Sequence, residues 1–282
     1  MIELDLGKVK IGPKHPLTLI SGPCVIESEA LALSTAKTLK ALTKSLGIQL
    51  IYKSSYDKAN RSSIHSFRGP GINKGLEILR RVKEEFDVPV TTDIHAPEEA
   101  KEVSEICDLL QIPAFLSRQT DLLVAAAETG AGINVKKGQF MAPWDMENVV
   151  LKIRSTGNNK ILLTDRGTSF GYNNLVSDFR SIPIMHSFGA PVCFDATHSV
   201  QLPGGKGTSS GGQSQFIPTL AKAAVAVGCS CIFLESHPEP EKALSDKDSV
   251  ISYGALPALL EELVKLYHVV QGEYSCSVST PL

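Results

Sequence analysis

The sequence predicts a single (β/α)8 barrel that spans residues 1–282. Eight short apolar segments alternate with eight segments of helical period, which is the order of this fold. The expected strands are apolar on both faces, as parallel strands buried between a core and a helix layer must be. An open doubly wound sheet is the alternative, but the turn Gly22-Pro-Cys24 after the first strand is not a glycine-rich phosphate motif.

The first part of the chain supplies five of these units. A small hairpin is expected at residues 1–15, because Ile2 and Leu4 alternate with charged residues. Gly47 ends the first helix, and Pro97 stands in the first turn of the third. The expected strands are 17–20, 48–52, 88–92, 109–112 and 132–135. The helices that follow them are 29–46, 73–86, 97–107, 120–128 and 143–155.

The second part supplies three more units and a polar tail at residues 271–282. The expected strands are 160–164, 191–194 and 229–234, and the expected helices are 177–188, 216–227 and 255–270. The loop 202–215 is rich in glycine and serine and cannot pack a core. We expect a mobile lid over the site there, with a plain flexible loop as the alternative.

Composition excludes several classes of protein. The net charge is only −2, so a nucleic-acid surface is not expected. No run of about 18 apolar residues is present, so no membrane span is expected. The N-terminus lacks the pattern of a signal peptide, and we expect a cytoplasmic protein. The six cysteines form no CxxC pair, and most of them are expected to be small buried hydrophobic residues, with Cys24 as the exception.

The active site of this fold lies at the C-terminal ends of the strands. Every expected strand brings a side chain that can bind or react to that rim. In strand order these are Cys24, Lys53, Asp93, Gln111, Lys136, Arg166, His198 and Glu235. A purely structural barrel has no need of cations, a thiol, an imidazole and carboxylates at one rim, so the sequence predicts an enzyme.

The cations among them form one group. They are Lys53, Lys58, Arg61, Lys136 and Arg166. Lysine supplies a compact charge and arginine a planar fork, and both suit phosphate and carboxylate. Five cations in one mouth predict a strongly anionic substrate with more than one such group.

A second group has the side chains that bind divalent transition metals. Cys24, His198, Glu235 and a nearby aspartate are such ligands, but they come from different strands and form no local motif. Alternatives remain at this point: His198 as a packed histidine bonded to Thr197 or Asp195, Cys24 as a small strand-end residue, and His237 as a competing ligand.

Several motifs resemble those of the 3-deoxy-D-manno-octulosonate 8-phosphate synthase family, in order and spacing, from Leu17 to Leu266. They are Lys53-Ser-Ser-Tyr-Asp-Lys-Ala-Asn-Arg-Ser-Ser63, Thr92-Asp-Ile-His95, Gln111-Ile-Pro-Ala-Phe-Leu116, Asn134-Val-Lys-Lys137, Asp165-Arg-Gly-Thr-Ser-Phe-Gly-Tyr-Asn173, Asp195-Ala-Thr-His198 and Glu235-Ser-His-Pro238. The resemblance implies a (β/α)8 barrel, usually a homotetramer. It also implies condensation of phosphoenolpyruvate with D-arabinose 5-phosphate and water, with release of phosphate, for the inner core of lipopolysaccharide.

The resemblance also assigns roles. Lys53, Lys58, Lys136 and Arg166 are expected to hold phosphoenolpyruvate, with Gln111 beside it. Arg61 and Ser62 are expected to hold the pentose phosphate, Asn60 to contact substrate, and Arg118 to reach a neighbouring subunit's site. The residues expected to act in catalysis are Lys53, Lys58, Asp93, Lys136 and His198.

The family divides at the position of Cys24, where metal-independent members have asparagine. The cysteine here implies a metal-dependent enzyme with Cys24, His198, Glu235 and Asp246 as ligands, and Asp248 as the competitor of Asp246. Zinc, iron, manganese or a similar ion would serve.

Two local patterns bear on the substrate. The segment Lys58-Ala-Asn-Arg61 differs from the Lys-Pro-Arg-Thr type of motif of the related heptulosonate-phosphate synthases, which favours arabinose 5-phosphate over erythrose 4-phosphate. The segment Gly211-Gly-Gln-Ser-Gln215 lacks the basic residue that many members have after Gly-Gly-Gln. A metal-dependent sugar-phosphate aldolase and a phosphosugar-binding sensor are the rival functions.

Overall fold

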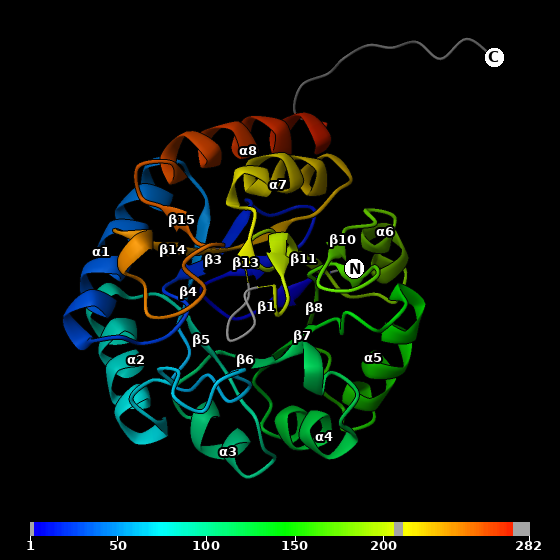
Figure 1. Cartoon of the computed structure of the whole chain (residues 1–282). Helices are drawn as coiled ribbons and strands as arrows, with labels where there is room; N and C mark the ends of the chain where they lie inside the picture. Colours follow the sequence, from blue (N-terminus) through cyan, green and yellow to red (C-terminus); the bar gives the residue numbers. More distant parts are fainter. Residues whose placement is uncertain (1–2, 206–210, 273–282) are drawn as a thin grey trace.

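The computed structural model describes residues 3–205 and 211–272. Eight parallel strands close into a barrel, and eight helices form a ring around it (Figure 1). Each strand pairs with its neighbour in chain order, and β14 pairs with β3 to complete the circle. The predicted (β/α)8 barrel is therefore confirmed.

The strands of the barrel agree with the predicted segments to within a few residues. They are β3 (Thr18–Gly22), β4 (Gln49–Lys53), β5 (Val90–Asp93), β6 (Leu109–Ile112), β7 (Gly132–Lys136), β8 (Ile161–Asp165), β11 (Val192–Asp195) and β14 (Cys231–His237). The last of these is longer than predicted, because Ser236 and His237 pair with the short strand β15 (Ile251–Ser252).

The helices also follow the predicted order. They are α1 (Glu29–Ser45), α2 (Ile72–Phe86), α3 (Glu99–Ser104), α4 (Thr120–Glu128), α5 (Met146–Arg154), α6 (Ser181–His186), α7 (Ile217–Ala226) and α8 (Leu256–Val270). The helix α6 is shorter than the predicted 177–188. The Asp178 side chain accepts a hydrogen bond from the Arg180 amide, which forms a turn before the helix. No helix in the described ranges is long and apolar enough to cross a bilayer.

The predicted N-terminal hairpin is present as β1 (Leu4–Asp5) and β2 (Lys10–Ile11). Two further hairpins were not predicted: β9 (Thr168–Ser169) with β10 (Leu175–Val176), and β12 (Gln201–Leu202) with β13 (Gly211–Gly212). Both hairpins lie in segments whose polar residues and glycines favour irregular loops. Residues 1–2 of the expected hairpin, 206–210 of the expected lid and 273–282 of the expected tail lie outside the described residues.

The barrel interior is layered. Alternate residues of a strand point to the same side, so two successive inward positions lie two residues apart. The lower layer is an apolar cluster to which the hairpin β1–β2 contributes, and β1 is labelled near the centre of the ring in Figure 1. The cluster contains Leu4, Val9, Ile11, Ile20, Ile51, Leu109, Leu162, Cys193, Cys231 and Phe233. The next inward positions carry the polar residues of the site.

Candidate active site and metal centre

A cavity of about 800 Å³ lies at the C-terminal ends of the strands. Its lining contains all five predicted cations, together with Asp93, Gln111 and His198. The loop residues Asn60, Ser62, Asp246 and Asp248 line it as well. The structure thus brings together, at one mouth, residues as far apart in the chain as Lys53 and Asp248.

The end of β4 places Lys53 at the floor of this cavity, where its side chain is only 1 % exposed. Its ammonium group donates to Glu235 Oε1 at 3.0 Å, to Ser55 Oγ at 2.9 Å and to the carbonyl of Cys24 at 3.1 Å. Burial alone would lower the pKa of Lys53, but the carboxylates of Glu235 and Asp93 outweigh it and raise the pKa. Lys53 is therefore a fixed positive charge.

The end of β7 supplies the second buried cation. Lys136 Nζ lies 2.6 Å from Asp195 Oδ2 and 3.8 Å from the centre of the Phe233 ring. Burial alone would raise the pKa of Asp195, but His198 and Lys136 hold it well below its ordinary value. Asp195 at the end of β11 therefore orients both a predicted substrate cation and a predicted metal ligand.

Two guanidinium groups that line the cavity have hydrogen-bond donors without an acceptor. Arg166 Nη2 donates to Gln201 Oε1 at 2.8 Å and to the carbonyl of His198 at 3.3 Å. Arg166 Nη1 and Arg61 Nη2 are buried and have no hydrogen-bond partner among the described residues. A buried donor without an acceptor is costly, so both atoms point to an anionic ligand as their partner.

A chain of hydrogen bonds links successive strands of the barrel beside these cations. Asp93 accepts from Ser55 Oγ and from Gln111 Nε2. Asn134 Nδ2 donates to Gln111 Oε1 at 3.1 Å, and Thr164 Oγ1 donates to Asn134 Oδ1 at 2.6 Å. Burial would raise the pKa of Asp93, but Lys53, Lys58 and Lys136 lower it, so the carboxylate stays ionised. The chain fixes the amide orientation of Gln111.

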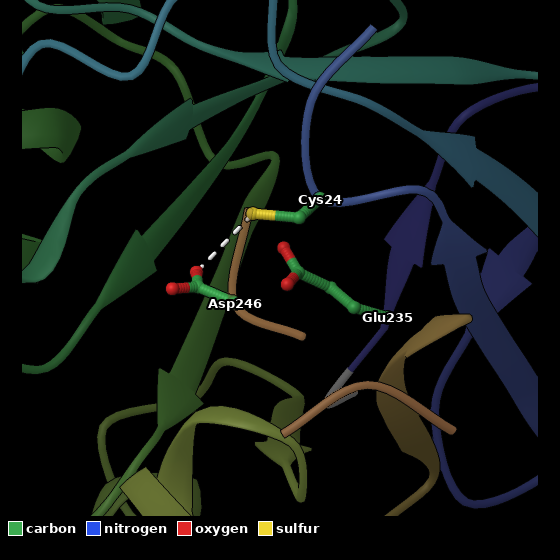
Figure 2. Close-up of side chains that lie close together, drawn as sticks. All are labelled: Cys24, Glu235 and Asp246. Atoms are coloured by element: carbon green, nitrogen blue, oxygen red, sulfur yellow. Dashed lines mark hydrogen bonds between the residues drawn. The ribbon is translucent and has the colours of Figure 1, made fainter. Parts of the chain in front are cut away.

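Figure 2 shows Cys24, Glu235 and Asp246 pointing toward one another. They come from the segment after β3, from β14 and from the loop that follows β14. One ligand atom from each lies within 4.8 Å of the others. Cys24 Sγ donates to Asp246 Oδ2 at 3.2 Å and lies 2.9 Å from Ser245 Oγ.

His198 stands beside this group. Its Nε2 lies 3.5 Å from Glu235 Oε2 and 3.8 Å from Asp246 Oδ2, while its Nδ1 lies 2.7 Å from Asp195 Oδ2. His198 can therefore contact Asp195 through Nδ1 and still offer Nε2 to a metal. The geometry fits both interpretations of this residue. Metal-binding histidines commonly give their other ring nitrogen to a carboxylate.

Cys24, Glu235 and Asp246 form a group that could hold a divalent transition metal, and the fourth predicted ligand, His198, lies beside this group without belonging to it. The four side chains offer sulfur, imidazole nitrogen and carboxylate oxygen, the donors that zinc and similar ions take. Ligand atoms around one such ion lie roughly 3–4 Å apart; Cys24 Sγ and Asp246 Oδ2 are 3.2 Å apart, and all three ligand atoms of the group lie within 4.8 Å. Burial, and then the charges of Asp246 and Glu235, raise the pKa of the Cys24 thiol. A cation among them would reverse that effect and favour the thiolate.

The two competing ligands, His237 and Asp248, are not part of the group formed by Cys24, Glu235 and Asp246. His237 Nδ1 accepts from the Glu239 amide at 3.0 Å, and its Nε2 faces Glu27 Oε1 at 3.7 Å. Asp248 lines the cavity, but in the described part of the chain the aspartate grouped with Cys24 and Glu235 is Asp246.

Comparison with known proteins gives the family. Residues 1–271 match the model of the DAHP synthetase I family. The chain belongs to this family. It is 59 % identical over 261 residues to the 2-dehydro-3-deoxyphosphooctonate aldolase of Protochlamydia amoebophila, covering 93 % of this chain and 95 % of that protein. It is 58 % identical over 269 residues to the protein of the same name from Geobacter metallireducens, covering 95 % of this chain and 99 % of that protein.

Membership of the DAHP synthetase I family agrees with the predicted resemblance. The geometry also shows partners that sequence reasoning left without a role: Ser55, Asn134, Gln201 and Ser245. Ser55 and Asn134 lie inside the quoted motifs, so position within a motif was the available signal. Arg118 is exposed and is not among the residues that line the cavity of its own chain.

Proposed function

We propose that this chain condenses phosphoenolpyruvate with D-arabinose 5-phosphate and water, giving 3-deoxy-D-manno-octulosonate 8-phosphate and inorganic phosphate. The observation that carries the proposal is one cavity with five cations beside a group of metal-binding side chains. The names of the two relatives support it. Both are called 2-dehydro-3-deoxyphosphooctonate aldolase, and the similarity extends over nearly the whole chain. The product would serve lipopolysaccharide synthesis.

Phosphoenolpyruvate would bind at the floor. Lys53 and Lys136 are almost fully buried there, and Arg166 offers an unpartnered nitrogen. Lys58 completes this group: burial opposes its charge, but Cys24, Glu235, Asp93 and Asp246 raise its pKa. Fixed cations of this kind bind a phosphate and a carboxylate without reorganisation.

The pentose phosphate would bind above it. Asn60 and Ser62 are exposed at the rim, and Arg61 lies between the rim and the interior, with its Nη1 3.8 Å from Asp246 Oδ1. Arabinose 5-phosphate held there would cover phosphoenolpyruvate. Its aldehyde would then point to the buried half of the cavity, where the two reactants meet in register.

In the reaction, C3 of phosphoenolpyruvate forms a bond to the aldehyde carbon, and the aldehyde oxygen gains a proton. Water adds its oxygen to C2, and the resulting hemiketal phosphate loses phosphate to leave a ketone. Lys53, Lys136 and Arg166 would balance the charge of the phosphate and carboxylate throughout. Asp195 would orient His198, and the ionised Asp93 would be the side chain available to accept a proton.

A divalent metal would be held by Cys24, His198, Glu235 and Asp246. When bound, such an ion supplies a Lewis acid that can activate water or orient the aldehyde. Zinc, iron or manganese would satisfy this donor set.

We also propose a homotetramer in the cytoplasm. The support for the oligomer is Arg118, which is exposed and does not line the candidate site, although Phe115 and Leu116 of the same segment do. An arginine placed in this way would complete a neighbour's site. Light scattering would give the mass, and mixed oligomers of Arg118→Ala with an inactive Lys53→Met chain would regain activity if Arg118 acts across subunits.

The test of the reaction is phosphate release from phosphoenolpyruvate plus arabinose 5-phosphate. It is measured before and after EDTA, and again with Mn²⁺, Zn²⁺ or Fe²⁺ restored. Release that is lost with EDTA and regained with metal supports both the reaction and the metal. If EDTA does not change phosphate release, the metal dependence is rejected and the proposed reaction stands. Release with erythrose 4-phosphate in place of the pentose would assign the related heptulosonate reaction, and cleavage of sugar phosphates without phosphoenolpyruvate would assign an aldolase.

A further inference from the structure

The hairpin β12–β13 contacts both the cation group and the loop that carries part of the metal-binding group. In β12, Gln201 accepts a hydrogen bond from Arg166, which belongs to the cation group. In β13, Gly212 is the residue paired with Gln201. On its other side, Gly212 lies against the loop that carries Asp246, a member of the metal-binding group.

The contact at Gly212 leaves no room for a side chain. A Cβ at this position would lie 2.5 Å from the carbonyl oxygen of Asp248, 2.7 Å from its carbonyl carbon and 3.1 Å from Ser249 Cβ. The first two atoms are backbone and cannot rotate away. The φ angle of Gly212 is not in the left-handed region, so only the close approach, and not the backbone conformation, demands glycine.

The loop on the other side of this contact is a tight turn. The Ser249 amide donates to the Asp246 carbonyl at 2.8 Å, and Ser249 Oγ donates to the same oxygen at 3.2 Å. Asp246 itself has a φ of 50°, in the left-handed region. A displacement of Asp248 and Ser249 therefore moves Asp246, because the three residues form one closed turn.

The side chain of Asp246 serves two partners. Its Oδ2 accepts from Cys24 Sγ at 3.2 Å, and its Oδ1 lies 3.8 Å from Arg61 Nη1. A shift of the loop would disturb the metal-binding group and the arginine proposed to hold the pentose phosphate. It would not touch Lys53 or Lys136, which are held by Glu235 and Asp195.

We propose that Gly212 is a positioning residue: its lack of a side chain lets β13 hold the Asp246 loop, and thereby sets metal affinity and pentose binding. The inference rests on the metal centre of the proposed function. Partners that orient metal ligands without touching the metal typically change its affinity by about 10–100-fold, and that is the range expected for Gly212→Ala.

The experiment measures cobalt binding to the metal-free protein by the charge-transfer band of the Cys24 thiolate, with a competing chelator to obtain the affinity. Gly212→Ala should bind Co²⁺ about 10–100-fold more weakly and should show a raised KM for arabinose 5-phosphate with little change in KM for phosphoenolpyruvate. The matched control is Gly254→Ala, whose Cβ would meet only Ser252 Oγ at 3.9 Å. It should bind cobalt as the unchanged protein does.

The outcomes separate this inference from the function on which it rests. If the unchanged protein gives no thiolate band, the metal centre is rejected. If it gives the band and Gly212→Ala binds cobalt with the same affinity, the positioning role is overturned. Should Gly212→Ala fail to fold by circular dichroism, Ser249→Ala tests the same turn by removing the hydroxyl bond to Asp246. Weaker cobalt binding then supports the proposal, and unchanged binding overturns it.

Discussion

The two ends of the barrel interior differ sharply although they lie only one inward position apart. On β4 the inward residues are Ile51 and then Lys53, and on β14 they are Phe233 and then Glu235. On β11 they are Cys193 and then Asp195. The lower residues pack in an apolar cluster, whereas the upper ones form ion pairs around the cavity.

The difference shows that the lower layer of the barrel interior serves stability and the upper layer serves the candidate site. The lower layer contributes stability through burial of apolar area, and it can tolerate changes of hydrophobic residue. The upper layer holds charges that are nearly as buried, at a cost in desolvation that only ion pairs and hydrogen bonds offset. Variants at neighbouring positions of one strand should therefore affect different properties.

The largest effect is expected for Lys53→Met. It removes a cation from the substrate site and leaves the buried Glu235 without its 3.0 Å partner. Loss of one fixed electrostatic group at a reacting centre typically costs about 10²–10³-fold in rate, so kcat/KM in the phosphate-release assay should fall by that factor. A folded variant with ordinary kcat/KM would show that the upper layer is structural.

The next effect concerns the dependence of stability on pH. Burial would raise the pKa of Glu235, but His198 and Lys53 lower it from 4.5 to about 2. A depressed pKa in the folded state means that this contribution is present above about pH 4.5 and is lost as the pH falls toward 2. Its size is on the order of 3 kcal/mol, at about 1.4 kcal/mol for each pKa unit.

Urea unfolding of the metal-free protein between pH 7 and pH 3 measures this contribution. The Glu235→Gln variant should be less stable than the unchanged protein at pH 7, and the gap should narrow as the pH falls. A gap that stays constant over this range would contradict the lowered pKa.

Cysteines at the two ends give the third comparison. Cys24→Ala removes a proposed ligand and should weaken metal binding by about 100-fold or more, since even partners outside the ligand set contribute 10–100-fold. Cys193→Ala, in the lower layer, should leave metal affinity unchanged. Chelator competition measures both, and equal losses in the two variants would reject the assignment of Cys24.

The smallest effect is expected for Ile51→Val, two residues before Lys53. It removes one buried methyl group from the lower layer and should cost about 1 kcal/mol of unfolding free energy. The value of kcat/KM should not change. A drop in activity with this variant would mean that the two layers are mechanically coupled.

The sequence predicted the eight strands and helices because apolar periodicity is a local property of each segment. It predicted which residues reach the rim, since the ends of parallel strands meet there. It did not predict the hairpin β12–β13, and it offered the contact of His198 with Asp195 only as an alternative to metal binding, whereas the structure places Asp195 2.7 Å from one ring nitrogen and leaves the other facing Glu235 and Asp246. These depend on distances between strands and loops that no single segment records. The choice between Asp246 and Asp248 likewise needed the turn after β14.

Among the described residues, the hairpin β1–β2 covers the N-terminal end of the barrel interior. Because Leu4, Val9 and Ile11 pack against the lower layer, small molecules cannot pass through to the far side. Whatever enters first at the mouth sits deepest, and it leaves last. Both products must therefore depart by the route on which fresh reactants arrive, so accumulating phosphate should compete with phosphoenolpyruvate for the same cations and slow turnover as the reaction proceeds.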